Sequence, residues 1–110
     1  EWLSVAEGEE SWLYPWGNEW DPTLLNSADN RDSSGLLPVG SLPAGATPGG
    51  VYDLLGNASE WVIGPAERPA MQLGGSWLHF GLNNHRQFWE TPQSAPGSIG
   101  FRCLRRLTTP

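Results

Sequence analysis

The sequence contains one cysteine among its 110 residues, so no disulfide bond can form within the chain. This fits a reducing compartment without establishing one. Cys103 lies between Arg102 and Leu104 in a stretch where apolar residues alternate. A free cysteine in that setting is more often a small buried hydrophobe than a reactive thiol. We therefore expect Cys103 to be buried on a strand face.

Basic residues are also scarce. Six Lys and Arg stand against twelve Asp and Glu, which gives a formal net charge of -6. This balance opposes non-specific nucleic-acid binding, which needs a basic surface, so we expect no nucleic-acid partner. No apolar run reaches the roughly 20 residues that cross a bilayer, so no membrane association is expected.

A targeting segment is missing as well. No basic-then-apolar leader is visible, although the chain starts at Glu1 without methionine, so an upstream leader could have been removed. The expected location is therefore either the cytoplasm or the cell surface.

Tryptophan, glycine and proline are abundant instead, with seven, fourteen and ten residues. Gly and Pro interrupt helices and strands, so the chain cannot be mostly helical. We expect a single α+β domain with short strands, long ordered loops and a core built largely from aromatic side chains.

Local patterns place a few regular elements. Residues 1–8 have helical character, and Gly8 suits the C-cap. Strands are expected at 60–63 and 71–77, and one helical turn within 82–89. The last strand should end near Leu107 and turn Ile99, Phe101 and Cys103 to one buried face.

The polar segment 26–50 has two interpretations. Its Gly, Ser and Pro content is typical of a flexible linker. It also carries oxygen-bearing side chains, at Asn26, Asp29, Asn30 and Asp32, that could pin an ordered loop around a cation.

The clearest chemical pattern is Asp53-Leu-Leu-Gly56-Asn-Ala58-Ser-Glu60. Two carboxylates flank a glycine turn that could aim the carbonyls of Gly56 and Ala58 between them. Calcium takes six to eight such oxygen ligands. The alternative is an ordinary turn with two solvated acids, because the spacing is not that of an EF-hand.

Other catalytic or metal patterns are weak. His79 and His85 lack a third ligand at zinc spacing. Ser76 stands in Gly-Gly-Ser-Trp and not in a Gly-x-Ser-x-Gly elbow. We expect neither a zinc site nor a serine nucleophile.

Five motifs occur in order: Tyr14-Pro-Trp-Gly17, Pro38-Val-Gly40, Asp53-Leu-Leu-Gly-Asn-Ala-Ser-Glu-Trp61, Leu73-Gly-Gly-Ser-Trp77 and Gly100-Phe-Arg-Cys103. Together they resemble the sulfatase-modifying-factor family, whose best-known member is the formylglycine-generating enzyme. The resemblance covers roughly residues 1–106 and implies that residues 1–110 form the C-terminal part of one family domain. It implies a variant of the C-type-lectin-like fold.

The resemblance also implies structural calcium. The family's ligands map onto the Asp53 side chain, the Gly56 and Ala58 carbonyls and the Glu60 side chain. A second family site maps onto Asn26, Ser27 and an acid in a shortened loop, for which Asp32 is the candidate.

At the catalytic positions the sequence departs from the family. The formylglycine-generating enzyme binds copper(I) through two cysteines after its Gly-Gly-Ser motif, and soft thiolates favour that ion. Alignment on Gly74-Gly75-Ser76 puts His79 and Asn84 there. The resemblance therefore implies a non-catalytic domain. The alternative is an oxidase, or an iron-dependent relative, completed by upstream residues.

A further resemblance is to the variable proteins of diversity-generating retroelements, which share this fold and the frame GGSW…R…GFR. It implies an exposed face over residues 78–89 that binds a protein or a small molecule, with Arg86 as scaffold. The face would comprise Leu78, His79, Phe80, Leu82, Asn83, Asn84, Gln87 and Phe88. The alternative is an ordinary family member with a degenerate site.

Overall fold

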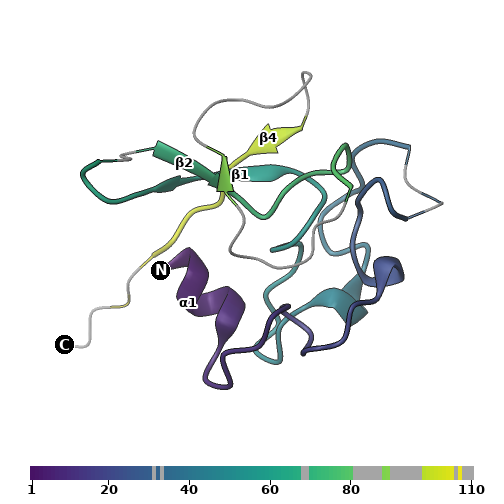
Figure 1. Cartoon of the computed structure of the whole chain (residues 1–110). Helices are drawn as coiled ribbons and strands as arrows, with labels where there is room; N and C mark the ends of the chain where they lie inside the picture. The colour runs from purple at the N-terminus through teal and green to yellow at the C-terminus, as the bar shows by residue number, and fades with distance from the viewer. Residues whose placement is uncertain are drawn as a thin grey trace.

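A computed structural model describes residues 1–30, 32, 34–67, 70–80, 88–89, 98–105 and 107 (Figure 1). Its elements in chain order are α1 (Trp2–Glu7), the 3-10 turns η1 (Pro22–Leu24) and η2 (Pro43–Gly45), and the strands β1 (Ser59–Ile63), β2 (Ala70–Leu73), β3 (Phe88–Trp89) and β4 (Ile99–Gly100). The expected small α+β fold with short elements and long loops is confirmed.

The four strands form one mixed sheet in the order β3-β2-β1-β4. Strand β1 pairs antiparallel with β2, so that Glu60 lies opposite Leu73, and parallel with β4, so that Glu60 lies opposite Gly100. Strand β3 pairs antiparallel with β2. The helical turn expected within 82–89 is therefore wrong at 88–89, which form a strand, and residues 82–87 lie outside the described residues.

Strand β2 ends at Leu73 and not at Trp77, because the next two residues leave the extended conformation. Gly74 and Gly75 have φ angles of 91° and 67°. A Cβ atom on Gly74 would lie 2.4 Å from the carbonyl oxygen of Leu54. Only glycine fits both the left-handed backbone and this close approach.

The prediction for the last strand is wrong. Strand β4 ends at Gly100, Phe101 is 76% exposed and Cys103 is exposed. The segment after β4 leads away from the body towards the C-terminus, on the side where α1 and the N-terminus lie (Figure 1). Residues 101–105 form no strand and are all exposed, so Cys103 is not the buried hydrophobe that its sequence context suggested.

The core is small and less aromatic than expected. Its hydrophobic cluster contains Tyr14, Leu25 and Leu55, with Trp16 packed against it. The rings of Tyr14 and Trp16 stack with centroids 5.2 Å apart. Much of the remaining buried material is polar, namely Asn26, Ser27, Asn57, Ser59, Glu60, Gln72, Ser76 and Ser98. Hydrogen bonds therefore carry much of the specificity of this core.

Helix α1 matches the sequence expectation. Gly8 follows it with φ 62°, and its backbone N–H donates to the carbonyl of Ser4. Ala6 is buried, and the Trp2 indole N–H donates to Glu60 over 3.2 Å, which ties the helix to β1. Within the part of the chain that the structure describes, no helix has the length and hydropathy needed to span a membrane.

Candidate functional site

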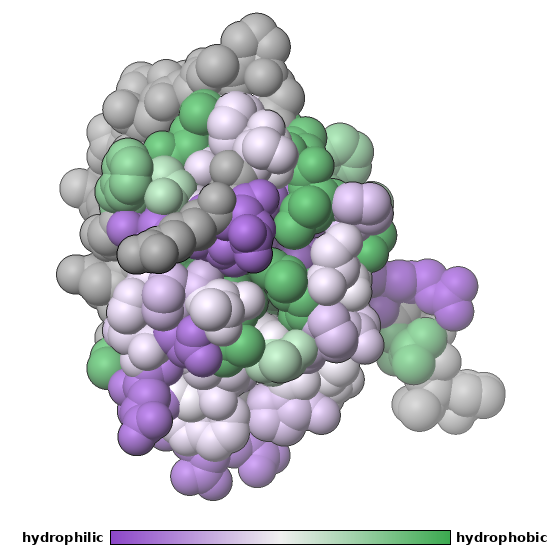
Figure 2. Space-filling model, turned by 90° about the vertical axis from the view of Figure 1, so that its right-hand side faces the viewer, coloured by the Kyte–Doolittle hydropathy of each residue, from purple (hydrophilic) through white to green (hydrophobic). Residues whose placement is uncertain are grey.

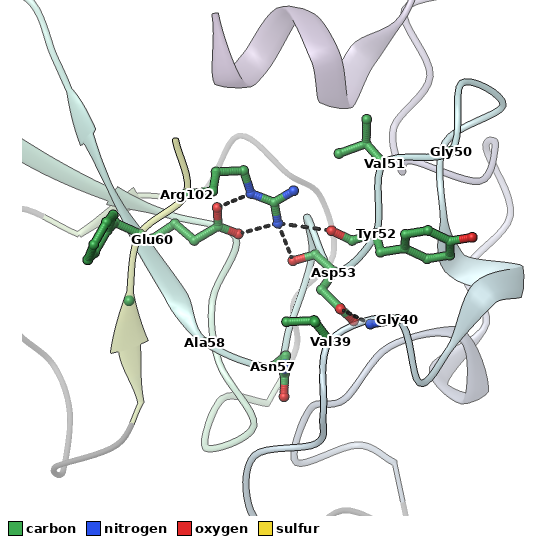
Figure 3. A pocket seen from close by; sticks show the side chains of 12 residues that line it. Val39, Gly40, Gly50, Val51, Tyr52, Asp53, Asn57, Ala58, Glu60 and Arg102 are labelled. Carbon is green, nitrogen blue, oxygen red and sulfur yellow. Dashed lines mark hydrogen bonds and ion pairs between the residues drawn. The ribbon is translucent and has the colours of Figure 1, made fainter. Parts of the chain in front are cut away.

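A cavity of about 620 Å³ lies where the loops 38–40 and 50–53 meet the ends of β1 and β4 (Figure 3). Its walls carry apolar side chains and three charged groups, from Val39, Tyr52, Asp53, Glu60, Phe101 and Arg102. The predicted calcium loop 53–60 thus lines this cavity.

The Glu60–Arg102 ion pair forms one side of the cavity. Arg102 donates from Nε to Oε1 of Glu60, and from Nη2 to Oε2 over 2.9 Å. The Glu60 side chain is 7% exposed and that of Arg102 is 36% exposed. A fork of two parallel bonds is the geometry that guanidinium and carboxylate groups favour. A nearly buried carboxylate is thereby neutralised by a partly exposed cation.

Arg102 also holds the preceding loop. Its Nη2 donates to the backbone carbonyls of Tyr52 and Asp53 over 2.9 and 3.1 Å. The guanidinium therefore joins the segment after β4 to β1 and to the loop at 52–53. Sequence reasoning placed Arg102 only on the outer face of a strand. Two features of the sequence could have indicated this role for Arg102. It stands in the motif Gly-Phe-Arg, and the earlier strand β1 contains a single acid, Glu60, that needs a partner.

Asp53 faces a different partner. Its Oδ2 accepts a hydrogen bond from the backbone N–H of Gly40 over 2.8 Å, and Figure 3 shows its carboxylate turned towards that loop. Its φ is 56°, in the left-handed region that non-glycine residues seldom occupy. The two carboxylates of the predicted calcium loop therefore have different partners: Asp53 accepts from Gly40, and Glu60 is paired with Arg102.

Asn57 is a second residue that the sequence reasoning missed. It has φ 66°, and asparagine is enriched in this region. Its Oδ1 accepts from the Leu37 backbone N–H and from Asn26 Nδ2, each over 2.9 Å. Its Nδ2 donates to the Leu37 carbonyl over 3.1 Å. These bonds fix Asn26 and Leu37, two residues of the segment 26–50, against the loop at Asn57, which contradicts the interpretation of a flexible linker.

As arranged, the loop does not form an open oxygen cage for calcium. Both oxygens of Glu60 are engaged by Arg102, and Oε1 also accepts from Trp2. Gly56 is buried against Asn26, whose carbonyl a Cβ would meet at 2.7 Å. A calcium ion on Glu60 would lie beside a guanidinium, and like charges repel. Binding by Asp53, Gly56, Ala58 and Glu60 would place calcium on the carboxylate that Arg102 already pairs, so the two cations would compete for Glu60.

The residues of the second predicted cation site take part in hydrogen bonds of their own. Asn26 and Ser27 are buried neighbours. Asn26 Nδ2 donates to the Gly35 carbonyl over 2.8 Å as well as to Asn57, whereas the Ser27 hydroxyl accepts from the Asp29 backbone at 3.3 Å. Asp32 is exposed, with its backbone N–H bonded to Asn30. No group of three or more His, Cys, Asp or Glu side chains that could hold a metal ion occurs among the described residues.

The turn after β2 fixes His79. Its Nδ1 accepts from the Ser76 backbone N–H over 2.8 Å and lies 3.0 Å from the Ser76 hydroxyl. The neutral ring therefore carries its proton on Nε2. The His79 carbonyl accepts from Ala28 over 2.9 Å. Burial lowers the pKa of His79 below its ordinary value of 6.5.

The residues on either side of His79 point outwards. Leu78 is 36% exposed and Phe80 is 75% exposed. Of the other predicted face residues, Leu82, Asn83, Asn84 and Gln87 lie outside the described residues. Phe88 belongs to β3, opposite Leu73, and its side chain is not described. Ser76 is fully buried.

Comparison with known proteins gives a consistent result. Residues 1–107 match the family model described as a sulfatase-modifying factor enzyme 1-like domain. An inactive Cα-formylglycine-generating enzyme 2 of Mus musculus is 35% identical over 131 aligned residues, which cover 100% of this chain and 42% of that protein. The Bos taurus protein of the same name is 32% identical, over 94% of this chain and 41% of its own length.

An active relative and a solved structure match as well. The formylglycine-generating enzyme of Bos taurus is 28% identical, over 94% of this chain and 36% of its own length. The crystal structure of CarF superposes with a TM-score of 0.63 at 24% identity, over 92% of this chain and 42% of that one, which shows a shared fold. The chain thus spans about two fifths of the length of the proteins it matches.

Proposed function

Because the chain belongs to the sulfatase-modifying factor enzyme 1-like domain family, we propose that it is a non-catalytic member whose role is binding. We further propose that its short strands and ordered loops form the C-terminal part of a C-type-lectin-like fold. The two inactive relatives, at 35% and 32% identity, support the non-catalytic assignment.

The observation that supports this proposal most directly is the hydrogen bonding of His79. Alignment on the Gly-Gly-Ser motif puts it where the oxidase has its first copper-binding cysteine. Here its Nδ1 accepts the Ser76 N–H, and its backbone is bonded to Ser76 and Ala28. The side chain therefore serves as a structural acceptor within the turn. Neither His79 nor Asn84 supplies the thiolate that copper(I) prefers.

The binding face is proposed to begin at residues 78–80. Leu78 and Phe80 flank the tethered His79 and are exposed, so the turn holds the backbone while apolar side chains face solvent. Rigid presentation of aromatic side chains gives contact area at a low entropic cost. A protein or a small-molecule ligand would meet this face.

Structural calcium on Asp53, Gly56, Ala58 and Glu60 is kept as part of the proposal, with Asn26, Ser27 and Asp32 as a second site. At the first site, calcium and Arg102 are alternative partners of Glu60.

The role of a retroelement variable protein is a hypothesis within this proposal. It requires that residues 78–89 vary between copies. Sequencing the neighbouring DNA tests it: a near-copy of the segment coding for residues 74–103, beside a reverse transcriptase, would be the supporting result. Its absence would leave a family member with a degenerate site.

An oxidation assay tests the non-catalytic assignment. A peptide containing Cys-x-Pro-x-Arg is incubated with the protein and copper(I), and aldehyde is measured by mass spectrometry, with the bovine enzyme as positive control. We expect no aldehyde. Copper(I) affinity is measured in a Cys103→Ser background, where we expect tight binding only after His79→Cys and Asn84→Cys are combined. Aldehyde formation by the unmodified chain would contradict the proposal.

The exposure of Phe80 on the proposed binding face can be tested by mutation. We expect Phe80→Ser to change the free energy of unfolding by less than about 0.5 kcal/mol, because the side chain is exposed. The matched control Leu55→Ser, at a residue that is 4% exposed, should lower it by about 3 kcal/mol. Equal losses for the two variants would mean that Phe80 is part of the core.

A further inference from the structure

The cavity around Asp53 has the dimensions of a small-molecule binding site. Its volume is about 620 Å³, and pockets for small molecules range over about 300–1,000 Å³. Such pockets have mostly apolar walls and a few polar groups that orient the ligand. The apolar part of this lining consists of Val39, Val51, Tyr52, Ala58 and Phe101. The charged groups of the cavity then determine which kind of ligand it accepts.

Asp53 supplies a charge that no side chain neutralises in the part of the chain that the structure describes. Glu60 is paired with Arg102, whereas Arg102 reaches only the backbone carbonyl of Asp53. The Asp53 carboxylate accepts one hydrogen bond over 2.8 Å, from the Gly40 N–H to Oδ2. A carboxylate can accept about four hydrogen bonds, so Asp53 retains acceptor capacity. The cavity therefore carries one uncompensated negative charge.

Three apolar side chains of the lining are exposed to solvent. Val39 is 87% exposed, Phe101 is 76% exposed and Tyr52 is 43% exposed. In Figure 2, which shows one face of the molecule, apolar residues likewise lie directly beside strongly hydrophilic ones. Gly40 and Gly50 add open space, because a Cβ atom on either would meet nothing within 4 Å. Since aromatic ring faces attract cations, a ligand in the cavity can gain both apolar contact and charge interaction.

We propose that this cavity binds a small organic cation, in which an ammonium group is attached to an aromatic or aliphatic body. The ammonium group donates to Asp53, and the body packs against Val39, Tyr52 and Phe101. A neutral apolar molecule would leave the charge of Asp53 uncompensated, and an anion would be repelled by it. The formal net charge of -6 on the chain also favours the approach of a cation.

The cavity is separate from the proposed binding face at residues 78–80, which contribute nothing to its lining. It shares Asp53 with the calcium site proposed above, so the two cations would be alternative ligands of that residue. A calcium ion takes six to eight oxygen ligands and gains nothing from apolar walls. An organic cation uses both the carboxylate and the walls.

Three probes of similar size and different charge test the proposal, namely phenethylamine, phenethyl alcohol and phenylacetate. Their affinities for residues 1–110 are measured by isothermal titration calorimetry at about pH 7, with EDTA present to remove calcium. We expect the amine to bind about tenfold tighter than the alcohol or better, because a hydrogen bond to a charged group contributes at least that factor. Phenylacetate should show no detectable binding.

Asp53→Asn tests the charge with little change of shape. Asparagine keeps an oxygen for the Gly40 N–H and is tolerated at the positive φ of this position. We expect the variant to bind the amine no more tightly than the alcohol. The control Glu67→Gln changes the net charge equally, at an exposed acid outside the cavity, and should keep the preference for the amine.

Val39→Ser tests the apolar wall. The Val39 side chain is exposed, so we expect the fold to be kept while the amine and the alcohol both bind about threefold more weakly. The control is Ile63→Ser, at an exposed residue outside the cavity, which should bind both probes as the parent chain does.

Three results would overturn the proposal. One is that phenethylamine binds no more tightly than the alcohol or phenylacetate. Another is that Glu67→Gln loses the preference for the amine as fully as Asp53→Asn does. The third is amine binding that neither Asp53→Asn nor Val39→Ser weakens, which would place the ligand elsewhere. Since calcium is removed throughout, these results are independent of calcium binding and of the oxidation assay.

Discussion

Arg102 donates two hydrogen bonds to the carboxylate of Glu60, which lies 42 residues earlier in the sequence. The bond from Nη2 to Oε2 is 2.9 Å long. The same guanidinium holds the carbonyls of Tyr52 and Asp53. One partly exposed cation thus joins the segment after β4 to the loop at 52–53 and to β1, which lie 42 to 50 residues earlier in the sequence.

Removing the cation should destabilise the chain. Arg102→Ala leaves the nearly buried Glu60 carboxylate without its partner, and we expect a loss of about 3 kcal/mol in the free energy of unfolding. Urea melts measure this. Arg105→Ala, at an exposed arginine on the same segment, is the control and should lose less than about 0.5 kcal/mol. If Glu60→Gln and Arg102→Ala were strictly additive in the double variant, the pair would not be coupled.

Calcium and Arg102 should compete for Glu60. In the parent chain we expect calcium to raise the melting temperature less than in a variant that lacks the Arg102 guanidinium, because the Glu60 carboxylate is already paired. Arg102→Gln removes the competing charge and should make the melting temperature calcium-dependent. Asp53→Ala in that background should abolish the effect. A large, chelator-sensitive stabilisation of the parent chain, undiminished by Glu60→Gln, would place calcium elsewhere.

His79 should make stability sensitive to mild acid. Its pKa is lowered in the folded chain by burial, so the unfolded chain binds the proton more readily. The stabilising contribution of the neutral ring is complete above about pH 6.5 and is lost as the pH falls below that value towards the lowered pKa.

The melting temperature between about pH 7.5 and pH 5 tests this, in a His85→Asn background where His79 alone titrates among histidines. His79→Asn preserves an acceptor for the Ser76 N–H and should flatten the profile while keeping most stability at neutral pH. A profile unchanged by His79→Asn would assign the acid sensitivity to other groups.

Gly74 should tolerate no side chain. Alanine there meets the Leu54 carbonyl at 2.4 Å in addition to adopting φ 91°. Gly50 has a similar φ of 84° but nothing within 4 Å, which makes it a matched control. We expect Gly50→Ala to lose about 1 kcal/mol from backbone strain, and Gly74→Ala at least about 2 kcal/mol more from the clash. Equal losses in the free energy of unfolding for the two variants would show that the loop around Leu54 moves to accommodate the added methyl group.

Some of the fold could be predicted because it depends on local chemistry. The helix at 2–7 and its end at Gly8 follow from apolar spacing and a glycine cap, and β1 follows from a short apolar run. The motifs identified the family, which the match over residues 1–107 bears out. The strand lengths after Leu73 and Gly100 were wrong, because they depend on what a strand packs against.

The site was predicted in part for the same reason. The loop 53–60 and the turn at 76–80 were identified, since acids around a glycine turn and a Gly-Gly-Ser motif are visible in the chain. The ion pair of Arg102 with Glu60 and the network of Asn57 with Asn26 were missed, because both join residues more than 30 positions apart.

The sequence by itself determined the family, the scarcity of regular structure and the absence of thiols at positions 79 and 84. Only the tertiary structure decided which charge Glu60 faces, that His79 is tied to Ser76, and that Phe101 and Cys103 stand exposed. The physical reason is that composition and local spacing fix which groups are available and which turns the backbone can make. Burial, pairing and the left-handed residues Asp53 and Asn57 are settled by contacts between distant segments.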